Sequence, residues 1–137
     1  MICPELDDLL EEEYWIVDIL PERVPKDPRG QYFAVEQYYL QEPRRSSIHR
    51  KYTNILLKLN CYFDMCVSED FGESWVENPE PEDVVSAGSV YAYFKDEGTL
   101  IVINEDDTYM TVYDPSHRML DMIRVLAAGE GVFVWKG

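Results

Sequence analysis

The chain has 137 residues, of which 46% are hydrophobic and 13% aromatic, and its formal net charge is −15. This much apolar and aromatic material excludes a disordered chain, and the length fits a single globular domain over residues 1–137. The negative charge repels phosphate groups, so we expect neither direct nucleic-acid binding nor membrane-surface binding.

The first thirty residues predict a short helix, a strand and a loop. Leu6, Leu9, Leu10 and Tyr14 recur at roughly helical spacing, with Pro4 near the first turn and acidic residues throughout, which indicates an amphipathic helix. Residues 14–20 read YWIVDIL and predict a strand that ends at Pro21. Three prolines and a glycine then predict a loop over residues 21–30.

A second helical region is expected between residues 31 and 59. Residues 31–41 fit neither the helical nor the strand period cleanly, and we favour a helix. Ser46 or Ser47 is expected to cap the next helix. Its predicted buried stripe is formed by Ile48, Tyr52, Ile55, Leu56 and Leu59.

From residue 59 onward the chain predicts mainly strands. A strand is expected over residues 59–67, a polar loop with exposed Phe71 and Trp75 over residues 68–81, and a helical turn over residues 82–87. Tight loops then separate three strands, at 90–95, 99–104 and 108–113. The middle strand is apolar on both sides, which is typical of a central strand.

The last predicted elements are a helix and a strand. Asp114 is expected to cap this helix, with Pro115 in its first turn and Gly129 and Gly131 ending it. Its buried stripe would comprise Met119, Met122, Ile123 and Leu126, and a final strand would follow at 132–135. The fold class predicted is α+β, with a mainly antiparallel sheet. Its C-terminal half reads β-β-β-α-β and packs with helices from the N-terminal half.

The charge is distributed in blocks along the chain. Residues 1–22 carry −8, residues 23–58 carry +5, and residues 59–137 carry −12. The basic block contains a patch formed by Arg44, Arg45, Arg50 and Lys51, with His49 inside it. This patch either binds an anion or acidic partner, or neutralises acidic segments of the chain itself, for example the N-terminal helix; we favour neutralisation.

No motif in the chain indicates a particular enzymatic reaction. Cys61 and Cys66 are too far apart for a zinc-ligand pair, and His49 and His117 are isolated. The acids 105–107, with Asp114, could bind a hard cation but lack the spacing of a calcium loop. Phosphate-binding glycine loops and nucleophile elbows are also missing. We therefore expect no catalytic residues, no cofactor and no metal site.

The cysteine content and the N-terminal sequence bear on location. The three cysteines, Cys3, Cys61 and Cys66, form no disulfide framework and are expected to be free thiols. The first residues lack the positive and apolar regions of a secretory signal. We expect a cytoplasmic protein.

The ten tyrosines provide the main functional signal. Tyr91 and Tyr93 share one strand face, as do Tyr109 and Tyr113, because side chains alternate along a strand. If these faces coincide, they form an aromatic surface rimmed by acids 96–97, 105–107 and 114. Alternatively, helices of the N-terminal half cover this face and the tyrosines belong to the core, which is the interpretation that we favour.

The favoured hypothesis is a non-enzymatic protein-binding module, similar to an inhibitor or an immunity protein, that recognises a basic protein. The residues predicted to bind this partner are Tyr91, Tyr93, Tyr109, Tyr113, Glu105, Asp106 and Asp107. One alternative is a DNA mimic, against which the basic block argues. Another is a small ligand-binding domain or enzyme with an aromatic pocket between sheet and helices.

Overall fold

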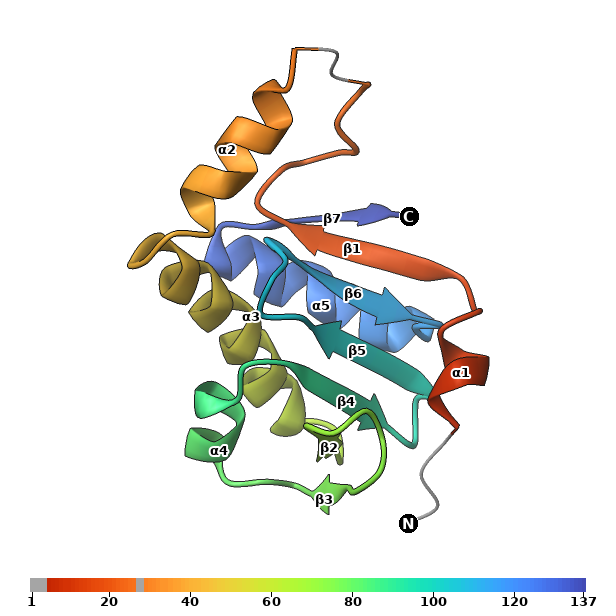
Figure 1. Ribbon diagram of the computed structural model, residues 1–137. Helices are drawn as coiled ribbons and strands as arrows, with labels where there is room; N and C mark the ends of the chain where they lie inside the picture. The colour runs from red at the N-terminus through yellow and green to blue at the C-terminus, as the bar shows by residue number, and fades with distance from the viewer. Residues whose placement is uncertain (1–4, 27–28) are drawn as a thin grey trace.

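Helices and one antiparallel sheet make up the molecule, as Figure 1 shows. The computed structural model describes residues 5–26 and 29–137. In chain order the elements are α1 (Leu6–Leu9), β1 (Tyr14–Asp18), α2 (Gln31–Tyr39), α3 (Arg44–Asn60), β2 (Cys66–Ser68), β3 (Val76–Glu77), α4 (Pro81–Ser86), β4 (Val90–Phe94), β5 (Thr99–Ile103), β6 (Tyr109–Tyr113), α5 (His117–Glu130) and β7 (Phe133–Lys136). The predicted Pro4 and Cys3 lie outside the described residues.

The strand order is β3-β2-β4-β5-β6-β1-β7. All neighbouring pairs are antiparallel, so the predicted α+β class and the C-terminal β-β-β-α-β order are confirmed. The apolar strand β5 is the central one, as its sequence indicates. Strand β1, from the N-terminal end of the chain, pairs between β6 and β7, which come from the C-terminal half.

The hydrophobic core lies on one side of this sheet. Alternate strand residues, including Val17, Ile101 and Met110, pack there against helices α3 and α5. All five residues of the predicted α3 stripe are buried, and Met119 and Ile123 of α5 are fully buried. The two long helices therefore take the same side of the sheet and lie behind it in Figure 1.

Both predicted serine and aspartate caps are wrong, for local reasons. Helix α3 begins at Arg44, so Ser46 and Ser47 lie inside it, and the Glu42 side chain accepts the Ser46 N–H at 2.8 Å. Helix α5 begins only at His117, so Asp114 lies before its cap position; Asp114 has a φ of 51°, and its N–H donates to Glu13 O. Ser116 instead caps α5 by accepting the Met119 N–H at 3.1 Å.

Other boundaries also differ from expectation. Helix α3 continues to Asn60 and β2 has only three residues, so the predicted strand over 59–67 is mostly wrong. The first helix ends at Leu9, and Tyr14 belongs to β1. Gly129 lies inside α5, whereas Gly131 ends it with a φ of 75°, a conformation that glycine tolerates.

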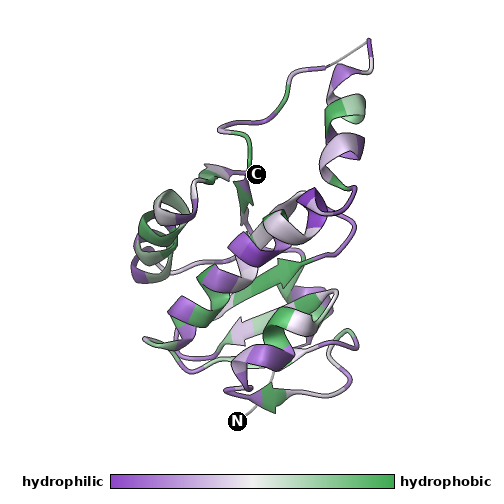
Figure 2. Ribbon diagram, turned by 90° about the vertical axis from the view of Figure 1, so that its left-hand side faces the viewer, coloured by the Kyte–Doolittle hydropathy of each residue, from purple (hydrophilic) through white to green (hydrophobic). Residues whose placement is uncertain are grey.

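Helix α2 stands away from the rest of the molecule, as both views show (Figures 1 and 2). None of its residues is buried, and Phe33 and Tyr38 are 64% and 53% exposed. This explains why its sequence fits no period, because an amphipathic pattern requires a buried side. No helix among the described residues has the length and apolarity needed to cross a bilayer.

Tyr52 links the core to the loop between β5 and β6. Its side chain is buried, and its hydroxyl donates to Thr108 O at 2.5 Å. We expect Tyr52→Phe to lower the free energy of unfolding by about 1 to 2 kcal/mol, because the buried carbonyl loses its donor. Urea denaturation measures this change. The exposed Tyr62 provides the control, since Tyr62→Phe should leave stability unaltered; equal stability of both variants would contradict the prediction.

Candidate functional site

The side of the sheet opposite α3 and α5 carries most of the strand tyrosines. Residues paired directly across antiparallel strands point to the same side. The register forms one row from Tyr93, Leu100, Tyr113 and Tyr14, and a second from Tyr91, Val102, Thr111, Ile16 and Trp135. A third row contains Tyr109, Asp18 and Phe133. We call this side of the sheet the tyrosine face.

The expectation that helices of the N-terminal half bury these tyrosines is wrong. Helix α3 packs against the other side, and the four predicted tyrosines are half-buried. Loops cover parts of this face instead: the Phe71 ring contacts the Tyr91 ring at 5.2 Å between centroids, and Leu100 is fully buried. Phe71 itself is exposed, as predicted, whereas Trp75 is half-buried.

A pocket of about 450 Å³ lies between the tyrosine face, the segment after β1 and the start of α2. Strands β1, β6 and β7 supply one wall, and Val24, Pro25 and Tyr32 supply another. The complete lining comprises Tyr14, Ile16, Asp18, Arg23, Val24, Pro25, Tyr32, Tyr109, Thr111, Tyr113 and Trp135. Five of these residues are aromatic, and two are charged.

Asp18 is the buried charged group of this pocket. Its residue is only 5% exposed, and Oδ1 accepts the Ile19 N–H at 2.7 Å. Within the described part of the chain, it makes no ion pair. Burial raises the pKa of the Asp18 carboxyl, the hydrogen bonds from Ile19 and Leu20 N–H oppose this, and the nearby Glu36 carboxylate adds to it.

Two more acids lie beside the pocket. The Tyr32 hydroxyl donates to Glu36 Oε2 at 3.3 Å, and burial together with Glu36 raises the pKa of Tyr32 to about 12. Asp107 is half-buried and hydrogen-bonds the Tyr109 side chain. Burial, followed by the Glu36 and Asp106 charges, raises the pKa of Asp107. This end of the tyrosine face is therefore strongly negative.

Trp135 forms the β7 side of the pocket. Its indole nitrogen is shielded from solvent and has no hydrogen-bond acceptor among the described residues. The guanidinium carbon of Arg23 lies 5.8 Å from the centre of the Trp135 ring, a cation–π distance. Arg23 is thus held by an aromatic ring rather than by the Asp18 carboxylate.

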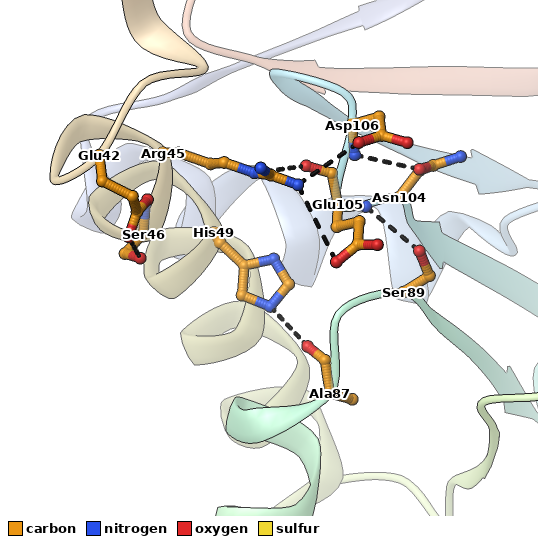
Figure 3. Close-up of polar contacts among 9 residues, drawn as sticks. All are labelled: Glu42, Arg45, Ser46, His49, Ala87, Ser89, Asn104, Glu105 and Asp106. Atoms are coloured by element: carbon orange, nitrogen blue, oxygen red, sulfur yellow. Dashed lines mark hydrogen bonds and ion pairs between the residues drawn. The ribbon is translucent and has the colours of Figure 1, made fainter.

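The structure separates the predicted acids into two groups, as Figure 3 shows for Glu105 and Asp106. Arg45 donates to Glu105 O at 3.0 Å, and its guanidinium lies 3.9 Å from the Glu105 carboxylate and 3.4 Å from that of Asp106. Both acids therefore face a cation of the same chain. Only Asp107 of this run joins the tyrosines.

The basic patch is likewise divided. Arg44 stacks on Tyr38 at 3.7 Å and donates to Tyr38 O, and Lys51 is half-buried near Gly131 at the end of α5. Arg45 and the exposed Arg50 line a second hollow together with acids Glu42 and Glu105. The expected neutralisation is found at Arg45, but with the β5–β6 loop rather than with the N-terminal helix.

Residues considered for metal or nucleophile chemistry do not converge. Strand β6 separates Asp114 from acids 105–107, because they lie at opposite ends of it. His49 Nε2 lies 3.0 Å from Ala87 O, as Figure 3 shows. The part of the chain that the structure describes contains no group of three His, Cys, Asp or Glu suited to a metal ion.

The chain matches no protein family model, no curated protein and no solved structure. The site is therefore argued from its own geometry. Sequence reasoning missed Tyr14, Asp18, Tyr32 and Trp135, which line the pocket with two of the predicted tyrosines. A signal existed for Asp18, since it shares one side of strand YWIVD with Tyr14 and Ile16 and places a charge on an otherwise apolar face.

Asp18 is expected to cost stability. We predict that Asp18→Asn raises the free energy of unfolding at pH 7 by roughly 1 kcal/mol, because it removes a buried unpaired charge and keeps an acceptor for Ile19 N–H. The raised pKa means that the folded state binds this proton more tightly than the unfolded state. The wild type therefore gains stability relative to Asp18→Asn as the pH falls through the raised pKa of the folded state. The difference in stability between the two proteins vanishes below pH 3.8, the pKa of an aspartate in the unfolded chain.

Thermal denaturation from pH 3 to pH 8 measures this difference. Asp121→Asn, on the exposed side of α5, is the matched control and should show no such pH dependence. Lower stability of Asp18→Asn at every pH would contradict the prediction.

Proposed function

We propose that this chain is a non-enzymatic protein-binding module that docks a basic protein on its tyrosine face, in the manner of an inhibitor or immunity protein. One observation carries the proposal: both long helices cover the same side of the sheet, so the strand tyrosines of the other side stay half-buried or exposed. A contiguous aromatic surface on a small protein marks an interaction site.

The residues of this face are suited to binding a protein. Tyr91, Tyr93, Tyr109 and Tyr113 offer rigid side chains that contribute contact area at little cost in conformational entropy. Helix α2 extends the surface, because Phe33 and Tyr38 are exposed on an element without any buried residue. A partner that lies between α2 and the sheet would contact both.

The negative charge of the tyrosine face indicates that the partner surface is positively charged. Asp18, Glu36 and Asp107 make no ion pair within the described residues, whereas Glu105 and Asp106 face Arg45. Uncompensated carboxylates attract a cationic surface and accelerate its association. We therefore propose Asp18, Glu36 and Asp107 as the main electrostatic contacts, with Glu105 and Asp106 at the periphery.

The test is to capture the partner and map its contact surface. The protein is used as bait in extract from its native cell at 50 and 300 mM salt, and the retained protein is identified by mass. The purified pair is then mapped by backbone amide chemical shifts. We expect a basic partner, weaker retention at high salt, and shifts concentrated in β1, β4, β6 and α2.

Two results would overturn the proposal. One is a partner whose contacts lie on the exposed side of α3, α4 or α5. The other is retention that is indifferent to salt. If duplex DNA competes with the module for its partner, the partner is a DNA-binding protein and the module acts as a DNA mimic. If duplex DNA does not compete, the DNA-mimic alternative is wrong.

A further inference from the structure

We propose that the pocket beside β1 binds one arginine side chain of the basic partner, with its guanidinium group against the Asp18 carboxylate. This inference rests on the proposed function and specifies which group of the partner the site recognises. The pocket offers the three features that an arginine side chain requires: a buried anion, aromatic walls and a surplus of negative charge.

The anion is Asp18. Asp18 is almost fully buried, yet within the described residues its carboxylate accepts hydrogen bonds only from the backbone N–H groups of Ile19 and Leu20. A buried carboxylate without a cation is costly, and it is usually compensated by ion pairing. The planar guanidinium donates two parallel hydrogen bonds to a carboxylate, which a lysine ammonium does not do.

The walls are aromatic. Tyr14, Tyr32, Tyr109, Tyr113 and Trp135 line the pocket together with Asp18. Guanidinium groups stack on such rings, and the methylene groups of arginine pack against apolar surface. The indole N–H of Trp135, which has no acceptor among the described residues, belongs to the same wall.

The local charge favours a cation even though Arg23 lines the pocket. Arg23 lies over Trp135 and makes no ion pair with Asp18. Against this single positive charge stand Asp18 and the neighbouring carboxylates of Glu36 and Asp107. The guanidinium carbon of Arg23, 5.8 Å from the Trp135 ring, also shows that this wall accepts such a group.

The experiment uses small probes in place of the partner. N-acetyl-arginine amide, N-acetyl-lysine amide and N-acetyl-citrulline amide are titrated into the ¹⁵N-labelled full chain, and the indole N–H signal of Trp135 is followed. Citrulline has the shape of arginine without its charge. We expect saturable shifts with arginine at a Kd of about 1 mM, and binding at least tenfold weaker with citrulline and with lysine.

Variants locate the site. Asp18→Asn should weaken arginine binding at least tenfold, whereas the matched Asp121→Asn on α5 should leave it unchanged. Arg23→Ala should strengthen it, because a like charge is removed. Equal binding of arginine and citrulline, no shift of the Trp135 signal, or unaltered binding by Asp18→Asn would overturn the inference.

This inference and the proposed function fail in different ways. If the arginine probe does not bind but the captured partner still contacts the tyrosine face, the pocket inference is wrong and the proposed protein-binding function still holds. If the probe binds at Asp18 but the partner contacts another surface, the pocket is an arginine site and the proposed docking face is wrong.

Discussion

Phe94→Ala should lower the free energy of unfolding by about 3 to 5 kcal/mol, the largest change in stability that we expect. Phe94 is fully buried at the end of β4, and its ring meets that of Phe63 edge-on at 6.2 Å between centroids. Truncation removes this contact and leaves a cavity between the sheet and the helices. Guanidinium denaturation monitored by circular dichroism measures the loss.

Tyr91→Ala provides a control on the same strand. Tyr91 points to the opposite side of the sheet and is half-buried, so its truncation exposes surface instead of creating an enclosed cavity. We expect a cost well below that of Phe94→Ala. Equal losses would mean that both sides of the sheet are core, which would remove the basis of the tyrosine face.

The largest expected change in binding follows from the double variant Tyr109→Ala, Tyr113→Ala. Both residues line the pocket on β6, where they are half-buried. Aromatic residues at the centre of an interface each contribute on the order of 1 to 2 kcal/mol, so affinity for the captured partner should fall about 100-fold. Isothermal titration calorimetry measures this affinity.

The control for this experiment is another tyrosine. Tyr62 is 61% exposed and follows α3, away from the tyrosine face. Tyr62→Ala should bind the partner as tightly as the wild type. If it loses affinity to the same extent as the double variant, the tyrosine face is not where the partner binds.

Much of the architecture could be predicted from local patterns. The spacing from Ile48 to Leu59 identifies the buried side of α3, and the apolar strand at 99–103 identifies the centre of the sheet. Helix ends were predicted less well. Sequence favours serine or aspartate as a cap. In the structure, the Glu42 side chain accepts a backbone N–H in the first turn of α3, and Asp114 adopts a left-handed conformation before α5.

The pocket could not be predicted, because its walls come from segments distant in sequence. Asp18 and Tyr109 face each other only because β1 inserts between β6 and β7. Tyr32 reaches the same pocket through the segment that follows β1. Likewise, the pairing of Arg45 with Asp106 joins residues 61 positions apart and depends on tertiary structure.

The detached position of α2 has an energetic consequence. A helix of nine residues is marginal by itself in water, and α2 has no fully buried residue; Tyr39 at its C-terminal end packs against the core. We therefore expect its folding to be coupled only weakly to that of the core, so that α2 unfolds locally at a lower free-energy cost than the sheet. The proposed partner, if it holds α2 against the sheet, would supply this packing, and part of the interaction energy would go into ordering the helix. Affinity for that partner would then depend on the helical propensity of residues 31–39 as well as on the contacts themselves.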